Sequence, residues 1–204
     1  MKLMLASGAA LLAALSFPAP SRAAVAVGSP APDFTATDSK GKTHSLGEFK
    51  GKTVVLEWNN PECPFVGKHY GSGNMQKQQA DAAAAGVVWL TVNSAAKGKQ
   101  GYVDGPAADA YVQKTGAKPS AYLLDREGIV GKLYGARTTP HMYVIDGQGT
   151  LRYMAGIDSV PSTDPDDLKG ATQYVRQALT EISSGKPVSV PTSQPYGCGV
   201  KYGS

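Results

Sequence analysis

The middle of the 204-residue chain alternates between short runs rich in β-branched and aromatic residues and longer segments that favour helices. The expected strands cover residues 53–58, 87–93, 121–125, 141–146 and 150–155. The expected helices cover residues 64–85, with an interruption at Gly71-Ser72-Gly73, and residues 106–115, 128–134 and 166–183. Strands joined through a helix run parallel, whereas strands joined by a tight glycine turn run antiparallel. The order therefore predicts an α/β fold with a mixed central sheet flanked by helices.

The two ends of the chain differ from this middle part. Residues 33–37 and 43–46 flank a turn over residues 38–42, which predicts an N-terminal β-hairpin. Residues 185–204 form a tail rich in Pro and Gly that carries Cys198. We therefore expect one domain over residues 24–184, followed by an extended C-terminal tail.

The first 23 residues have the pattern of an export signal. The basic Met1-Lys2 precedes an uncharged apolar stretch up to Phe17, and Ser21 and Ala23 place small residues before a cleavage point. This pattern predicts a signal peptide over residues 1–23 and a periplasmic or secreted protein that is not inserted in a membrane after cleavage. The alternative is a single membrane anchor, for which the stretch is short.

Composition narrows the chemistry further. The chain has 2 Cys and 3 His, and its formal net charge is +4. Two cysteines exclude a four-thiolate zinc site within one chain but allow one disulfide, which can persist outside the cytoplasm. The Lys and Arg residues form no dense cluster, so nothing predicts nucleic-acid binding. The cysteines and histidines show no spacing typical of a metal site, and we expect neither a metal nor another cofactor.

Two long segments of the chain are VGSPAPDFTATDSKGKTHSLGEFKGKTVVLEWNN (27–60) and LLDREGIVGKLYGARTTPHMYVIDGQGTLRY (123–153). Together with the order of the elements, they resemble the two halves of a redoxin, the branch of the thioredoxin superfamily of the alkyl hydroperoxide reductase and thiol-specific antioxidant type. NNPECPFVGKHY (59–70) and PYGCGVKY (195–202) are similar to a peroxiredoxin-like subgroup. The resemblance covers roughly residues 27–184. It implies a thioredoxin-like fold, a reactive Cys63, and a cis-proline at Pro140 after Thr139.

The sequence also departs from these families. Val66 stands where thioredoxins carry the second cysteine of Cys-x-x-Cys. Leu56 and Asn60 stand where typical peroxiredoxins carry the Pro and Thr of their signature. Glu57, six residues before Cys63, falls where thioredoxins keep a buried carboxylate. The resemblance therefore implies thiol chemistry and leaves the substrate open.

Cys63 is the candidate nucleophile, because a thiolate attacks peroxides and disulfides. It immediately precedes Pro64, which suits the first position of a helix, and a helix N-terminus favours a thiolate. Three supporting roles are hypotheses: Glu57 as proton acceptor, Asn60 as hydrogen-bond partner, and Lys68, His69 and Arg137 as nearby positive charges. The alternatives are a buried inert cysteine and polar residues without a role in catalysis.

Cys198 is the candidate resolving cysteine, because its tail is long enough to fold back onto the domain. Its thiol would convert a sulfenic acid at Cys63 into a disulfide. The alternatives are a permanent Cys63–Cys198 staple and a disulfide between two chains.

Three functions follow. The first is an exported peroxiredoxin-like peroxidase that uses an external thiol reductant, either a thioredoxin-like protein or a small thiol. The second is a thiol–disulfide exchange protein. The third is a non-catalytic thioredoxin-like module that contains a structural disulfide. Function inferred from fold analogy alone does not separate them.

Overall fold

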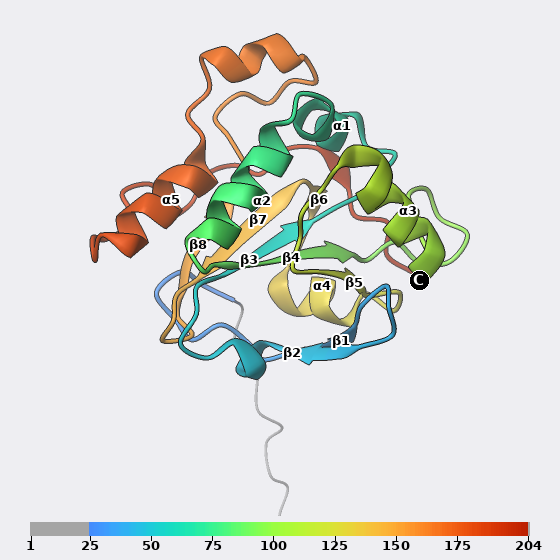
Figure 1. Ribbon diagram of the computed structural model, residues 1–204, viewed down its shortest axis with the longest axis horizontal. Coiled ribbons are helices and arrows are strands. Elements are labelled where there is room, and N and C mark those ends of the chain that lie inside the picture. Colours follow the sequence, from blue (N-terminus) through green and yellow to red (C-terminus); the bar gives the residue numbers. More distant parts are fainter. Residues whose placement is uncertain (1–24, 204) are drawn as a thin grey trace, which may run out of the picture.

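The computed structural model describes residues 25–203, and its centre is a five-stranded mixed sheet (Figure 1). The strands are β3 (Val54–Trp58), β4 (Val88–Asn93), β5 (Ala121–Leu124), β7 (His141–Ile145) and β8 (Leu151–Ala155). Their order across the sheet is β5-β4-β3-β7-β8. Strands β3, β4 and β5 run parallel, and β7 and β8 are antiparallel to their neighbours. The expected mixed sheet is confirmed.

Helices cover both faces of this sheet. The helices are α1 (Pro64–Gly71), α2 (Asn74–Ala84), α3 (Gly105–Thr115), α4 (Ile129–Tyr134) and α5 (Tyr174–Ser183). Strand β3 alternates between the faces: Val54, Leu56 and Trp58 pack on the side that holds α4, whereas Val55 packs on the side that holds α1, α2 and α5. The predicted interruption at Gly71-Ser72-Gly73 separates α1 from α2, and Gly73 has a φ of 77° that other residues rarely adopt.

The N-terminal hairpin closes the α4 side of the sheet. It consists of β1 (Thr35–Thr37) and β2 (Thr43–Ser45), followed by the short helix η1 (Leu46–Phe49). Phe34 and Ala36 pack into the core under α4.

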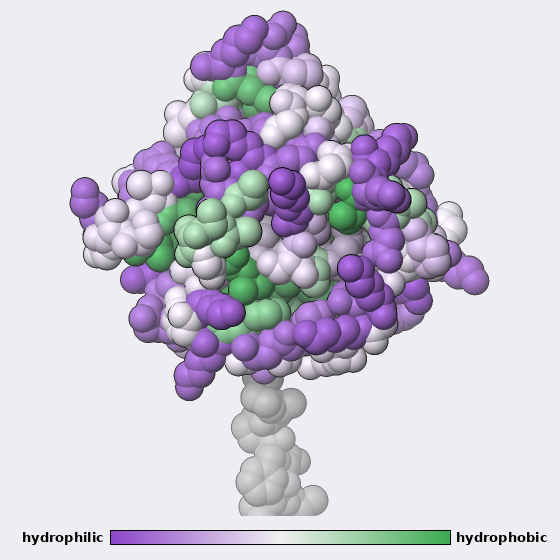
Figure 2. Space-filling view, viewed as in Figure 1, coloured by the Kyte–Doolittle hydropathy of each residue, from purple (hydrophilic) through white to green (hydrophobic). Residues whose placement is uncertain are grey.

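Figure 2 shows that the face seen there is mostly hydrophilic, with small groups of apolar residues between. No helix of the described part of the chain is long and apolar enough to cross a membrane.

One predicted element is wrong. The single helix expected over residues 166–183 is two pieces, η2 (Pro165–Lys169) and α5, and η2 stands away from the sheet (Figure 1). Thr172 lies between them and hydrogen-bonds through its backbone to Ser159 in both directions. These bonds take the backbone groups that a continuous helix would need for its own ladder.

The C-terminal tail folds back over the domain. Residues 191 and 192 run beside β8, where the Met154 amide donates to the Pro191 carbonyl. The tail then forms β9 (Cys198–Gly199), which pairs antiparallel with the two-residue strand β6 (Thr138–Thr139). The predicted signal peptide, residues 1–23, lies outside the described residues.

Candidate active site

Cys63 caps the N-terminus of α1, and Pro64 is the first residue of that helix. The Cys63 amide donates to the Asn60 carbonyl at 3.0 Å, and the Cys63 carbonyl accepts from the Gly67 amide at 2.8 Å. These two bonds fix the thiol at the point where the helix presents free N–H groups. The residue is only 1% exposed, although it follows a loop of polar residues.

The Cys63 thiol faces the backbone of Thr139. Its Sγ donates to the Thr139 carbonyl oxygen at 3.0 Å, and the Thr139–Pro140 peptide bond is cis. Thr139 itself is 2% exposed, because the tail lies over it. The sequence-predicted Thr139 therefore contacts the candidate nucleophile directly, and Pro140 follows it across the cis peptide bond.

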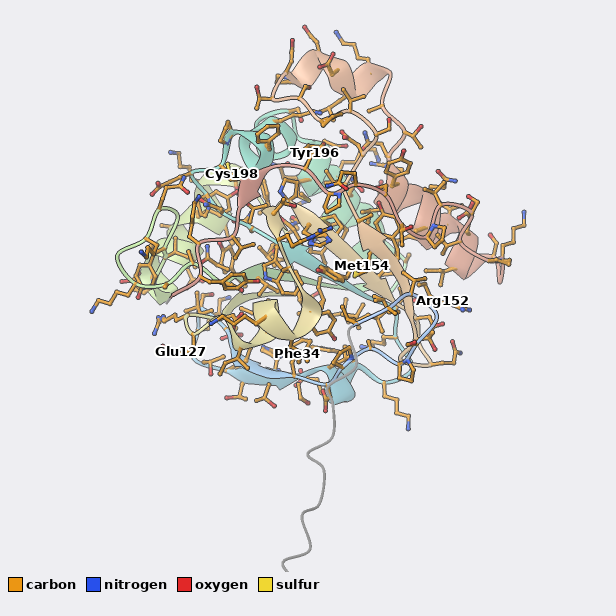
Figure 3. All side chains as sticks on the ribbon, turned by 180° about the vertical axis from the view of Figure 1, so that it is seen from behind. Phe34, Glu127, Arg152, Met154, Tyr196 and Cys198 are labelled. Carbon is orange, nitrogen blue, oxygen red and sulfur yellow. The ribbon has the colours of Figure 1, made fainter. Side chains whose placement is uncertain are left out.

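Cys198 lies opposite Thr139 in the β6–β9 pair. The Thr139 hydroxyl donates to the Cys198 carbonyl at 3.3 Å, and the Val200 amide donates to the Arg137 carbonyl at 3.0 Å. Both cysteines are free thiols and contact the same apolar cluster. Figure 3 shows Cys198 beside α1, the helix that Cys63 caps. The fold thus brings together two thiols that are far apart in the sequence.

The environment of Cys198 favours its protonated form. Burial raises the pKa of the Cys198 thiol to about 11, and the hydrogen bond and charge of Cys63 act in the same direction. Lys201 opposes this effect with a smaller contribution. At neutral pH, Cys198 is therefore a protonated thiol.

Glu57 lies in the middle of β3, completely buried on the face that carries α1 and α2. Its two carboxylate oxygens accept hydrogen bonds from five side chains, those of Asn59, Tyr70, Gln79, Trp89 and Thr91. Desolvation raises the pKa of this carboxyl above its usual range, against the lowering effect of the Tyr70 and Trp89 bonds. No hydrogen bond joins Glu57 to Cys63 among residues 25–203, and its nearest polar neighbours are the aromatic hydroxyl and indole groups.

Two other candidates point elsewhere. The Asn60 amide nitrogen donates to Gln100 at 2.9 Å, and its oxygen accepts from the Glu62 amide, so the side chain shapes the loop rather than the thiol. The Arg137 side chain lines a cleft with His141 and Lys132 and makes no hydrogen bond or ion pair with another described residue. Its backbone, not its charge, contacts the cysteine-bearing tail.

The sequence indicates Lys68 and His69 only as positive charges near Cys63, and it does not show the buried polar cluster that they form. Lys68 and His69 on α1, Asp158 after β8 and Tyr196 in the tail contact one another. A lysine and a histidine early in the helix that follows Cys63 were the available signal, but their acidic partner is 90 residues away. Within the described residues, no group of three or more His, Cys, Asp or Glu side chains is arranged to hold a metal ion.

Two curated relatives are similar to this chain. Thiol-disulfide oxidoreductase ResA of Geobacillus kaustophilus is 32% identical over 124 residues, which are 55% of this chain and 71% of ResA. The chloroplastic peroxiredoxin Q of Triticum aestivum is 30% identical over 138 residues, which are 64% of this chain and 58% of that protein.

Solved structures share the fold. An uncharacterized conserved protein of Geobacillus kaustophilus superimposes with a TM-score of 0.77 at 24% identity, over 87% of this chain and 93% of its own. The thioredoxin domain of a thiol-disulfide oxidoreductase of Bacteroides vulgatus has a TM-score of 0.50 at 17% identity, over 72% of this chain and 98% of its own. The fold is therefore thioredoxin-like.

The family model of AhpC/TSA matches residues 27–154, which include Cys63, Thr139 and Pro140. This match covers more than half of the chain and the whole central sheet except the last residue of β8. The chain belongs to the AhpC/TSA family of redoxins.

Proposed function

We propose that this protein is an exported thiol peroxidase in which Cys63 is oxidised and Cys198 resolves the product. The single observation that carries this proposal is the β6–β9 register, in which Cys198 lies opposite Thr139. The Thr139 carbonyl accepts the hydrogen bond of the Cys63 thiol. A resolving thiol must reach the oxidised sulfur, and here it is held beside it by strand pairing.

The proposed reaction has three balanced steps. The Cys63 thiolate attacks the terminal oxygen of a hydroperoxide, the O–O bond breaks, and the alkoxide takes a proton to leave as an alcohol. Cys63 is then a sulfenic acid. The Cys198 sulfur attacks the Cys63 sulfur, a disulfide forms, and the hydroxyl leaves as water after taking up the Cys198 proton. Two equivalents of an external thiol reduce this disulfide and become a disulfide themselves.

The burial of Cys63 supports a small oxidant. The thiol is 1% exposed, and β9 lies against β6 beside it. A hydroperoxide needs to bring only one oxygen to the sulfur, whereas a protein disulfide must bring two covalently attached chains. The reductant acts on the disulfide after Cys198 has reacted, and Cys198 is the more exposed of the two cysteines.

We further propose that the chain is exported and consists of a signal peptide over residues 1–23, a redoxin domain over residues 24–184 and a tail over residues 185–204. This organisation is supported by the sequence pattern before Ala23 and by the two-cysteine content, which suits an oxidising compartment. In this proposal Glu57, Pro64, Thr139 and Pro140 remain supporting residues, Asn60 supports the loop before Cys63, and Arg137 supports the tail through its backbone.

Thiol–disulfide exchange is the second candidate. The name of the ResA relative, at 32% identity, favours it. In this reaction a Cys63 thiolate would attack a disulfide of the substrate, one substrate sulfur would leave as a thiolate, and Cys198 would release the other by closing the intramolecular disulfide.

One experiment separates the candidates. The reduced protein without residues 1–23 is mixed with one equivalent of hydrogen peroxide, quenched after set times and measured by intact mass and peptide mapping. We expect a loss of two hydrogens that maps to Cys63–Cys198, and in Cys198→Ser an added oxygen that stays on Cys63. An unchanged mass on the timescale of seconds would contradict peroxidase function.

A parallel arm offers oxidised glutathione in place of peroxide. Reaction with glutathione and not with peroxide would favour disulfide exchange. A protein that reacts with neither, and whose Cys63–Cys198 disulfide resists mild reductants, would be a structural module. Cys63→Ser is the control in both arms and should be inert.

A further inference from the structure

Four polar side chains beside the cysteine pair take no part in the steps above. Lys68 and His69 lie on α1, Asp158 follows β8, and Tyr196 lies in the tail. Lys68, His69 and Asp158 are at most 2% exposed. Ionisable side chains are rarely buried to this extent, and burial costs free energy unless each group is paired. A buried ion pair joins α1 to the segment after β8, and the hydrogen bonds of Tyr196 join both to the tail.

The hydrogen bonds of the cluster run in one direction. The Asn74 amide nitrogen lies 2.8 Å from His69 Nδ1 and can only donate, so Nδ1 accepts and the ring proton is on Nε2. His69 Nε2 then donates to the Tyr196 hydroxyl at 3.2 Å, and that hydroxyl donates to Asp158 Oδ1. Burial lowers the pKa of His69 to about 4, which agrees with a neutral ring.

Lys68 completes the charge balance of this chain of bonds. Its Nζ lies 3.3 Å from Asp158 Oδ2 and donates to the Val160 carbonyl at 2.9 Å. The ammonium also lies 5.7 Å from the centre of the Tyr196 ring. Asp158 therefore receives a hydrogen bond on one oxygen and a positive charge on the other, and Tyr196 is the group that links the carboxylate to the tail.

The cluster connects the two segments that carry the cysteines. Phe65, two residues after Cys63, packs edge-on against Tyr196, with ring centroids 5.8 Å apart. Tyr196 precedes Cys198 by two residues, and Figure 3 shows both beside α1. A displacement of Tyr196 would therefore be transmitted to Cys198 over a very short stretch of chain.

Gly197, between Tyr196 and Cys198, lets the tail lie close to the backbone of Thr139. Its φ is 130°, and a Cβ at this position would lie 2.0 Å from the Thr139 carbonyl oxygen. That oxygen is also the acceptor of the Cys63 thiol. A side chain at residue 197 would thus push the tail away from the carbonyl that accepts the hydrogen bond of the Cys63 thiol.

We propose that Tyr196 is a positioning residue for Cys198. Its hydroxyl, held between His69 and Asp158, keeps the Cys198 thiol beside Cys63, so that the attack of Cys198 on oxidised Cys63 is fast. The proposal rests on the proposed function in one respect, because it requires that a Cys63–Cys198 disulfide forms. It does not depend on whether the oxidant is a peroxide or a disulfide.

The test uses Tyr196→Phe in the protein without residues 1–23. This variant keeps the aromatic ring that packs on Phe65 and removes the hydroxyl. Rapid mixing with hydrogen peroxide, quenching and intact mass give two rates: addition of oxygen to Cys63 and loss of that oxygen as the disulfide closes. We expect the first rate to stay within about twofold, while the second falls at least about tenfold, in line with the loss of a hydrogen bond to a charged group.

Tyr134→Phe is the matched control. Tyr134 is buried, and its hydroxyl donates to a backbone carbonyl, that of Pro32, on the opposite face of the sheet. If loss of stability alone slowed disulfide closure, both variants would be slow. The proposal requires that Tyr134→Phe closes the disulfide at the rate of the unsubstituted protein.

A second measurement does not need peroxide. Each protein is equilibrated with mixtures of reduced and oxidised glutathione, and the fraction with the Cys63–Cys198 disulfide gives the effective concentration of Cys198 at Cys63. We expect this concentration to fall at least about tenfold in Tyr196→Phe. Failure of the unsubstituted protein to react with peroxide would contradict the peroxidase proposal only. Equal closure rates and equal effective concentrations in Tyr196→Phe and the unsubstituted protein would overturn the role of Tyr196.

Discussion

The two faces of strand β3 differ in what they bury. On the side of α4 and the hairpin, Val54, Leu56 and Trp58 join a continuous apolar core. On the side of α1 and α2, the same strand buries Glu57, a carboxyl with five donors around it. Because alternate residues of one strand face opposite ways, one five-residue segment contributes only to the apolar core on one side and contributes both Val55 and the carboxyl of Glu57 on the other. The Cys63 thiol lies on the same side as Glu57, within an apolar cluster that includes Val55.

Cys63→Ser should have the largest effect on function and a small effect on stability. Serine can donate to the Thr139 carbonyl as the thiol does, so the fold should lose less than about 1 kcal/mol. Turnover of peroxide or disulfide should fall to the uncatalysed rate, because no nucleophilic sulfur remains at α1. Denaturant titration and a steady-state assay measure both. A substituted protein that keeps its activity would place the chemistry elsewhere.

Leu56→Ala should reduce stability strongly and function only slightly, because the Leu56 side chain lies in the apolar core on the α4 side of the sheet. The side chain is completely buried in the core, and its loss should cost about 2–5 kcal/mol of unfolding free energy. At temperatures where the variant is still folded, the rate of Cys63 oxidation should stay within about threefold, because no contact of Cys63 is removed. Urea unfolding and quenched-flow mass spectrometry give the two values. A large fall in rate with intact fold would show that the two faces are not independent.

Glu57→Gln tests the buried carboxyl on the other side of β3. An amide nitrogen would meet donors that now point at a carboxylate oxygen, which should cost about 3 kcal/mol. The raised pKa of Glu57 means that its folded state holds the proton more tightly than the unfolded state. Its contribution is complete below the usual carboxyl pKa and declines as the pH rises through the raised value. The stability difference between the unsubstituted protein and Glu57→Gln should therefore shrink from pH 4.5 to pH 8, which urea titrations at several pH values would check.

Protonation of His69 should change the pH dependence of stability least. It should lower stability as the pH falls, whereas Glu57 lowers stability as the pH rises. Its pKa is about 4 in the folded protein, where desolvation outweighs the attraction of Asp158 and acts with the repulsion of Lys68. The unfolded state therefore binds more protons between pH 6.5 and pH 4, and stability falls as the pH is lowered through this window. Down to pH 5 the loss is at most about 2 kcal/mol. His69→Gln should flatten this slope, whereas an unchanged slope would assign it to other groups, such as His141.

The elements of the sheet could be predicted because each carries its own local signal. The runs around Val54 and Val88 are apolar and β-branched, and glycines such as Gly116 end the helices. The break between η2 and α5 could not be predicted in this way. It depends on the hydrogen bonds between Thr172 and Ser159. The periodicity of apolar residues in a sequence does not show which backbone groups form hydrogen bonds with a distant segment.

The two cysteines of the candidate site could be named from the sequence, but the contacts of the residues that surround them could not be predicted. Cys63 and Cys198 stand out because the chain has 2 Cys. That Cys198 pairs with Thr139 depends on a tail that returns over the sheet, which no local pattern encodes. Lys68 could be named from the sequence as a positive charge near Cys63, but only the fold brings its partners Asp158 and Val160 to it. Arg137 shows the opposite error, since a charged residue near the motif contributes its backbone instead.

The position of Cys198 near the end of the chain has a thermodynamic consequence. A bond between Cys63 and Cys198 would close a loop of about 135 residues, two thirds of the polypeptide. Closing a loop of this size removes so many conformations from the unfolded chain that it can raise the unfolding free energy by up to about 5 kcal/mol. The dithiol and disulfide forms should then melt at clearly different temperatures, and the melting curve of an untreated sample would read out its oxidation state without any label.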